Sequence, residues 1–208
     1  MSQFFTLHPE QPQLRLIKQA ADIVRKGGLI AFPTDAAYAL GGHTGDASLL
    51  DRIRRIRDVD ERHLFTLMCR DLSEIATYAR VDNTQYRLLK ATTPGPYTFI
   101  LEGTKELPRR VLHPKRKTIG LRVPDHPLVK ALLDELNEPL LVSTLILPGD
   151  EFPLADVEEI RERMEKQVDL VIECGGCGTE MTTVINLADG STELIRQGLG
   201  PLAPLGLG

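Results

Sequence analysis

The stretch "LRLIKQAADIVRKGGLIAFPT", residues 14–34, joins an amphipathic helix to a buried strand. Leu16, Ala20 and Val24 recur at the spacing of one helical face, and the glycine pair that follows is typical of a helix end. The apolar run 29–34 then predicts a short buried strand that ends at a proline turn. Because helices that alternate with buried strands are typical of α/β folds, this stretch predicts an α/β sheet covered by helices.

The same alternation continues along the chain. Apolar periodicity predicts further helices and strands, the helices at 47–57, 71–78, 83–90, 126–136 and 156–166, and the strands at 64–69, 97–103, 118–124, 139–147, 168–172, 182–187 and 193–198. Several late strands have no helix between them, so we expect a mixed sheet. No linker is visible. We therefore expect a single domain over 1–208, with its core at about 14–198, and the tail 201–208 is the only candidate for disorder.

Composition limits the partners that the protein can have. The 208 residues are 42% hydrophobic and 26% charged, which is enough for one substantial core. With a formal net charge of -4, the chain can meet a polyanion only through a local basic surface. It has neither a long apolar run nor a signal-peptide pattern, so we expect a cytoplasmic protein with no membrane contact.

Several common catalytic and metal-binding motifs are absent. The chain has no phosphate-binding P-loop, no G-x-G-x-x-G fingerprint, no G-x-S-x-G elbow and no H-E-x-x-H helix. Cys174 and Cys177 form a C-x-x-C, but zinc would need two more clustered ligands, and the intervening glycines favour a surface turn without a function. The sequence therefore predicts no metal site.

Polar residues at strand ends are the first candidates for a site, because ligands of open α/β sheets bind beyond the strand ends. The predicted strands place polar side chains there at Thr34, Thr98, Arg122, Ser143 and Thr144. Each of these residues alone is also consistent with an ordinary strand position.

Two stretches of the chain are rich in arginine and lysine, and the sequence leaves the role of each open. "DRIRRIRDVDERH", 51–63, holds five arginines, most of which the helical wheel places on the solvent side. "KELPRRVLHPKRKTIGLR", 105–122, has seven cations against the single acid Glu106. It is either a solvated connector or a surface that holds phosphates.

Ordered motifs resemble those of the YrdC family. "AFPTDAAYALG" (31–41), "TPGPYTFIL" (93–101) and "GLRVPDHPLV" (120–129) resemble its P-T-[ED]-T-x-Y-G-L, W-P-G-P-x-T and R-x-P-x-H-P segments, and "PLLVST", "TTVINL" and "LIRQG" follow in order. "FTLMCRDLSE" and "KRKTIG" resemble the YciO subgroup most closely. The resemblance implies a twisted, open mixed sheet with helices packed on it and a concave, positively charged cavity.

The resemblance also implies an activity. YrdC-type members are L-threonylcarbamoyladenylate synthases, nucleotidyltransferases of tRNA modification that combine L-threonine, bicarbonate and ATP. The implied partners are those substrates, with Mg2+ accompanying ATP, and no tightly bound cofactor is expected. Cations and hydroxyls would stabilise charge on the reacting phosphate and carbamate.

Matching the motifs residue by residue gives the implied site. The implied catalytic residues are Thr34, Arg57 and Arg122. The implied substrate- and nucleotide-binding residues are Tyr38, Thr98, Ser143, Thr144, Thr182 and Arg196.

Departures from the family pattern fall on phosphate and nucleotide contacts. Val59 occupies the position of the second cation of a K-x-R motif, and Leu145 and Leu147 occupy an S-x-N motif. We therefore expect weak or altered activity in a reshaped cavity, unless Arg62 or His63 restores a cation. The alternative is a module that binds RNA, whether double-stranded RNA, tRNA or rRNA.

Overall fold

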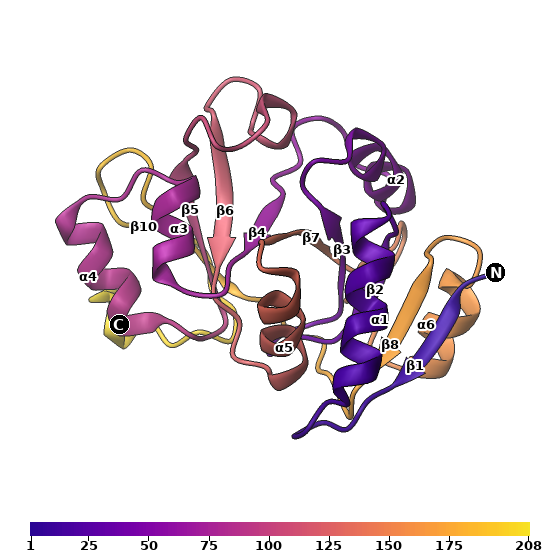
Figure 1. Cartoon of the computed structure of the whole chain (residues 1–208). Helices are drawn as coiled ribbons and strands as arrows, with labels where there is room; N and C mark the ends of the chain where they lie inside the picture. The colour runs from indigo at the N-terminus through magenta and orange to yellow at the C-terminus, as the bar shows by residue number, and fades with distance from the viewer.

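A ten-stranded sheet organises the chain, of which the computed structural model describes residues 1–208 (Figure 1). The strands are β1 Gln3–Thr6, β2 Ile30–Phe32, β3 Ala39–His43, β4 Thr66–Met68, β5 Tyr97–Glu102, β6 Thr118–Arg122, β7 Leu140–Thr144, β8 Leu170–Glu173, β9 Thr183–Asn186 and β10 Glu193–Arg196. Their spatial order is β1-β8-β2-β3-β7-β4-β6-β5-β9-β10. Pairs β1·β8, β2·β8, β4·β6 and β5·β9 are parallel and the others antiparallel, so the predicted mixed, open sheet is confirmed.

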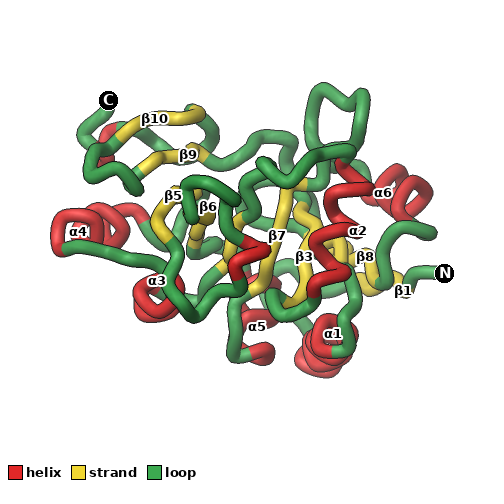
Figure 2. The backbone as a smooth tube through the Cα atoms, turned by 90° about the horizontal axis from the view of Figure 1, so that it is seen from above, coloured by secondary structure: helices red, strands yellow, loops and turns green.

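Helices cover both faces of this sheet. They are α1 Leu14–Arg25, α2 Ala47–Arg57, α3 Leu72–Tyr78, α4 Asn83–Thr92, α5 Pro127–Leu136 and α6 Val157–Met164, with short 3-10 turns at Arg109–Val111 and Ala203–Leu205. Figure 2 shows α1 and α5 side by side on one face and α6 on the other. None of the helices combines the length and the apolar character that crossing a membrane requires.

Strand β2 is buried on both faces, which explains why its sequence lacks polar alternation. Ile30 and Phe32 pack in the hydrophobic cluster that includes α1 and α5. Ala31 packs in the larger cluster that includes residues of α2, α3, α4 and α6. Successive strand residues point to opposite faces, so a strand covered on both sides is apolar throughout.

Helix α2 begins and ends as its sequence predicts. The Asp46 carboxylate accepts a hydrogen bond from the Ser48 backbone N–H at 2.9 Å and caps the first turn. Asp58 then adopts a left-handed conformation, with φ 53°, and ends the helix. Arg57 therefore lies in the last helical turn, directly before the chain turns away.

Two strands and the C-terminal segment differ from the sequence prediction. The prediction missed β1, which pairs with the edge of β8, and β3, whose glycines hide the strand pattern. A Cβ on Gly41 would lie only 2.8 Å from Val142 Cγ1, so glycine permits the close approach of β3 and β7.

The tail 201–208, the only candidate for disorder, is ordered in the structure. The Tyr97 hydroxyl donates to the Pro201 carbonyl at 2.7 Å, and the Thr183 hydroxyl donates to the Gly200 carbonyl at 2.7 Å. Leu205 is buried. The partners of the tail lie on β5 and α4, far away in sequence, so its local composition does not reveal them.

Candidate functional site

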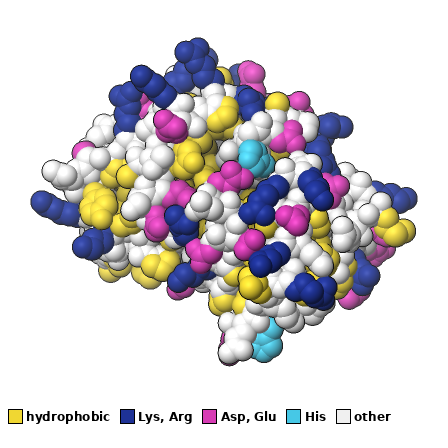
Figure 3. Space-filling model, in the orientation of Figure 1, with side chains coloured by type: hydrophobic (Ala, Val, Ile, Leu, Met, Phe, Trp, Pro, Cys, Tyr) yellow, Lys and Arg dark blue, Asp and Glu magenta, His cyan; other side chains and the backbone are white.

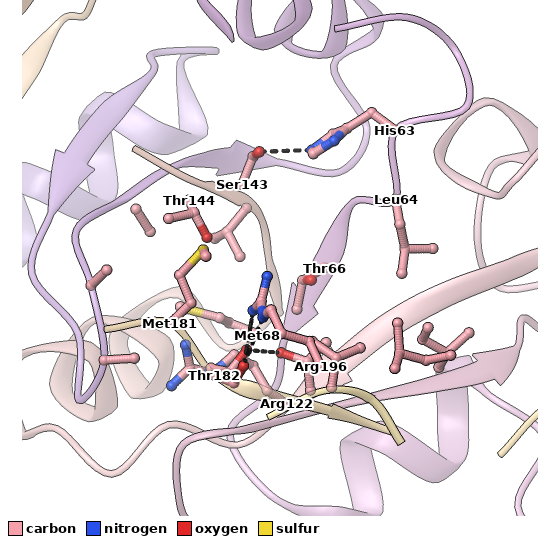
Figure 4. A pocket seen from close by; sticks show the side chains of 18 of the residues that line it. His63, Leu64, Thr66, Met68, Arg122, Ser143, Thr144, Met181, Thr182 and Arg196 are labelled. Atoms are coloured by element: carbon pink, nitrogen blue, oxygen red, sulfur yellow. Dashed lines mark hydrogen bonds between the residues drawn. The ribbon is translucent and has the colours of Figure 1, made fainter. Parts of the chain in front are cut away.

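A cavity of about 530 Å³ brings most of the predicted site residues together (Figure 4). Strands β3 to β7, β9 and β10, together with the end of α2, contribute to its lining. The lining includes the predicted residues Tyr38, Arg57, Thr98, Arg122, Ser143, Thr144, Thr182 and Arg196. Segments that are far apart in sequence thus meet at one place on the sheet, as expected for a ligand site of an open α/β fold.

Thr34 is the exception, because it does not line the cavity. Its buried hydroxyl donates to the Ala37 carbonyl at 2.7 Å and accepts from the Ala36 N–H at 3.0 Å. Both alanines line the cavity, so Thr34 shapes the turn that forms this wall. Tyr38 does line the cavity, but its hydroxyl is bonded to the Ile172 carbonyl at 2.9 Å.

Arg122 forms a buried ion pair with Asp35. The guanidinium is 6% exposed and the carboxylate 9% exposed, and the second oxygen of Asp35 accepts from the Asp125 N–H at 2.9 Å. Burial lowers the pKa of Arg122, and the charge of Asp35 opposes that effect. The Nε atom of Arg122 is buried without a partner. This arginine therefore has its counter-charge and a buried Nε donor without a partner.

Thr98, Thr182 and Arg196 form a second polar group. The two threonine hydroxyls lie 2.8 Å apart. Arg196 donates from Nε and Nη2 to the Thr182 carbonyl at 3.1 and 2.9 Å, and the two residues lie next to each other in Figure 4. Burial lowers the pKa of Arg196. The Thr182 carbonyl accepts hydrogen bonds from the Arg196 guanidinium, but no carboxylate balances the positive charge of Arg196.

Arg57, Ser143 and His63 form a third group at the end of α2. Arg57 Nη1 donates to Ser143 Oγ at 2.7 Å, and Arg57 Nε donates to the Ile146 carbonyl at 3.3 Å. His63 Nε2 lies 2.9 Å from Ser143 Oγ, the contact drawn in Figure 4, and 3.2 Å from Arg57 Nη1. Chiefly through burial, and then through the charge of Arg57, the pKa of His63 is lowered to about 4.

The charges around the cavity are unevenly compensated. Arg122 has Asp35, whereas neither Arg57 nor Arg196 is within salt-bridge distance of a carboxylate. Burial and the nearby charge of Arg196 together lower the pKa of Arg57. A cation that is partly buried without a counter-charge is stabilised by a bound anion. The arrangement is therefore suited to a negatively charged ligand.

The arginines of the 51–63 stretch do not share one environment. Arg55 is exposed, as the helical wheel predicts. Arg52 and Arg54 are partly exposed: Arg52 pairs with Asp169 at 2.8 Å, and Arg54 lies over the ring of Phe65.

The substituted family positions lie away from the cavity wall. Val59, Leu145 and Leu147 are absent from the lining. Leu145 is fully buried, and its N–H donates to the Tyr38 carbonyl at 2.8 Å. Of the two residues suggested to replace the lost cation, Arg62 is exposed and outside the lining, whereas His63 reaches the cavity but is neutral near pH 7.

Sequence reasoning gave His63 no binding role beyond that suggestion. Its only local signal is its place directly before the strand run 64–69. The partner hydroxyl of Ser143 is 80 residues away, which no local pattern reveals.

The cysteines and the acidic residues form no metal centre. The structure has no group of three or more His, Cys, Asp or Glu side chains that could hold a metal ion. All three cysteines are free. Cys174 is buried rather than at the surface, and the Cys177 thiol, whose pKa burial raises, donates to the Ala36 carbonyl at 3.3 Å. The prediction of a surface turn is therefore correct for the glycines and wrong for Cys174.

Comparisons with known proteins identify the family. A family model described as telomere recombination, which covers Sua5, YciO and YrdC proteins, matches residues 22–198. The chain is 57% identical over 204 residues to YciO of Escherichia coli K12, covering 98% of this chain and 99% of that protein. The crystal structure of E. coli YciO matches with a TM-score of 0.95 over 98% of this chain and 99% of that chain.

More distant relatives extend the comparison. The threonylcarbamoyl-AMP synthase of Halorhodospira halophila is 29% identical over 170 residues, covering 81% of this chain and 88% of that protein. P. abyssi Sua5 complexed with L-threonine is 22% identical and matches with a TM-score of 0.89, over 97% of this chain and 59% of that chain. At that identity the likeness to Sua5 concerns the fold.

Proposed function

The chain belongs to the Sua5/YciO/YrdC family, and on that premise we propose that its cavity binds ATP and supports a weak or altered threonylcarbamoyl-AMP synthase reaction. The observation that carries the proposal is the pair of arginines, Arg57 and Arg196, that share the cavity without a carboxylate. They come from α2 and β10, and a polyphosphate is the kind of ligand that would neutralise both.

The reaction requires positioning and charge stabilisation rather than a protein nucleophile. A carbamate of L-threonine, formed with bicarbonate, attacks the α-phosphorus of ATP, and the bond to pyrophosphate breaks. Arg57 and Arg196 would stabilise charge on the phosphates. Arg122 would offer its free Nε donor to the carboxylate or carbamate, beside the Thr98 hydroxyl. Mg2+ would accompany ATP as part of the substrate.

Weak affinity for ATP is part of the proposal. Val59, Leu145 and Leu147 provide no polar contact to the cavity. Each hydrogen bond to a charged group that is lost weakens binding by about 1.5–3 kcal/mol. High ATP concentrations are therefore required in any assay.

A direct assay combines the protein with Mg2+, ATP, L-threonine and radioactive bicarbonate, and measures labelled adenylate together with pyrophosphate. We expect both products in equal amounts, and a strong decrease for Arg196→Gln. Arg87→Gln, which changes an exposed arginine on α4, is the matched control and retains the activity. Absence of labelled adenylate above background at millimolar ATP would overturn the catalytic proposal.

A second candidate function, RNA binding, is supported by the segment between β5 and β6. The cations of this segment are all exposed, and none of them forms an ion pair, namely Lys105, Arg109, Arg110, Lys115, Arg116 and Lys117. Figure 3 shows Lys and Arg side chains gathered over this loop, at the upper edge of the molecule. Exposed cations without carboxylate partners are suited to a phosphate backbone.

Gel shifts with double-stranded RNA and tRNA test this second function. The complex should weaken steeply as salt increases, because each phosphate contact releases counterions. The double variant Lys115→Gln/Arg116→Gln should bind more weakly, whereas Lys18→Gln/Lys130→Gln, on α1 and α5, should bind like the original protein. Equal binding by both variants would exclude the loop as the contact surface.

A further inference from the structure

His63 is held by two groups that favour a neutral ring. Its Nε2 atom lies 3.2 Å from Arg57 Nη1 and 2.9 Å from Ser143 Oγ. A guanidinium can only donate, so a hydrogen bond with Arg57 requires Nε2 to carry no proton. Ser143 is compatible with this assignment, since its oxygen accepts from Arg57 at 2.7 Å and its hydroxyl proton is then free to be donated to Nε2 of His63.

The charges that face this ring are mostly positive. Arg54 and Arg57 face it from α2, Asp60 from the loop after α2, and Arg196 of β10 lies beyond Arg57. Burial, Arg57 and Arg54 lower the pKa of His63 to about 4, and only Asp60 opposes them. A proton on Nε2 would place a second cation against Arg57, which is why the free protein excludes it.

An anionic ligand reverses this balance. Its oxygens would accept from Arg57 and reduce the positive field at His63. A protonated Nε2 would then have an anion to which it can donate, in place of a guanidinium.

We propose that anion binding in this cavity is coupled to the uptake of one proton by His63, which becomes an additional cation of the occupied site. The proton comes from solvent and is held at Nε2, where it is donated to a ligand oxygen. This inference rests on the proposed function, because it requires that the cavity bind a phosphate-containing anion. It makes His63 a residue that binds the ligand in a pH-dependent way.

Linkage determines the sign of the pH dependence. The bound state holds a proton that the free state lacks, so affinity increases as the pH falls from about 8 to about 5.5. Each pH unit within the coupled range contributes up to about tenfold in affinity. A purely structural histidine would contribute no such dependence.

Titration calorimetry with Mg-ATP and with pyrophosphate, in buffers of different ionisation enthalpy, measures the protons taken up. The matched variant is His63→Gln, which keeps a hydrogen-bonding group for Arg57 and Ser143 but cannot take up a proton. At about pH 5.5 we expect the original protein to take up nearly one proton more than the variant, and at about pH 8 the two should agree. Comparison with the variant removes the protons that belong to the ligand itself.

A spectroscopic measurement on the original protein supports the same test without a variant. The ring signals of His63 in NMR should change to those of an imidazolium when pyrophosphate is added at about pH 5.5, while those of the exposed His8 should not.

The outcomes separate the two proposals. Binding without extra proton uptake, or an equal loss of affinity in His63→Gln at both pH values, would overturn the proton coupling and leave the proposed function intact. Failure of the original protein to bind either ATP or pyrophosphate would overturn both.

Discussion

The cavity has two ends that treat their arginines differently. At the paired end, made of Asp35 and Arg122, the buried guanidinium has its own carboxylate. At the open end, made of Arg57, His63 and Ser143, the guanidinium has only neutral partners. Figure 4 shows the Ser143 and His63 pair well apart from Arg122. The difference teaches that a charged residue in a pocket indicates a charged ligand only where the protein has not already neutralised it.

The largest expected effect comes from breaking the paired end. Asp35→Asn leaves Arg122 buried without a counter-charge, so the free energy of unfolding should fall by about 3–5 kcal/mol. Urea denaturation measures it. The control is Asp22→Asn, which breaks an exposed pair with Arg25 and should change stability by less than about 1 kcal/mol. Similar losses in both variants would show that the paired end is no more than a surface interaction.

Removing the charge of the open end should affect binding rather than stability. Arg57→Gln should weaken ATP binding by about 1.5–3 kcal/mol, roughly ten- to a hundredfold, because a charge-assisted hydrogen bond is lost. Its unfolding free energy should not decrease, since the arginine has no carboxylate to leave behind. Equilibrium binding and urea denaturation are the two measurements.

The control for this second experiment lies on the same helix. Arg55 is exposed, and Arg55→Gln should retain ATP affinity and stability within about 0.5 kcal/mol. A loss of stability in Arg57→Gln with unchanged ATP binding would contradict the distinction between the two ends.

The smallest expected effect concerns acid stability at the open end. The pKa of His63 is lowered from 6.5 to about 4. In the unfolded chain this histidine therefore binds a proton below about pH 6.5, whereas in the folded protein it binds one only near pH 4. The contribution of His63 to the free energy of unfolding is therefore fully present above pH 6.5 and is lost as the pH falls toward 4. Between pH 7 and about pH 5.5, the Tm of His63→Gln should fall a few degrees less than that of the original protein. His8→Gln serves as the control, and identical pH profiles for all three proteins would contradict the prediction.

Local sequence patterns predicted most elements of the fold. The apolar face and the Asp46 cap of α2 are both present, because a helix of this kind is specified within a few turns of chain. The strand β3 was missed because Gly41 and Gly42 serve a close contact with a neighbouring strand and carry no alternating pattern. The packed tail was missed for a similar reason, since its partners lie on β5 and α4, about a hundred residues earlier in the chain.

The candidate site was predicted by ordered motifs rather than by spacing. The family that these motifs resemble is confirmed, and the cavity gathers every residue that they implied except Thr34. Thr34 instead bonds within its own turn. The partners of Ser143 and Arg122 could not be predicted, because their contacts with His63 and Asp35 join positions 80 or more residues apart.

The sequence by itself determined the alternation of helices and strands, the caps and the family, since these depend on neighbouring residues or on ordered motifs. Only the tertiary structure decided which charges are compensated. Arg57 and Arg122 are alike as residues, and what separates them is that Asp35 lies beside one, 87 residues away in sequence, while a neutral histidine and a serine lie beside the other. Electrostatic interactions depend on distance and burial in space, so the charge of the site follows from the fold.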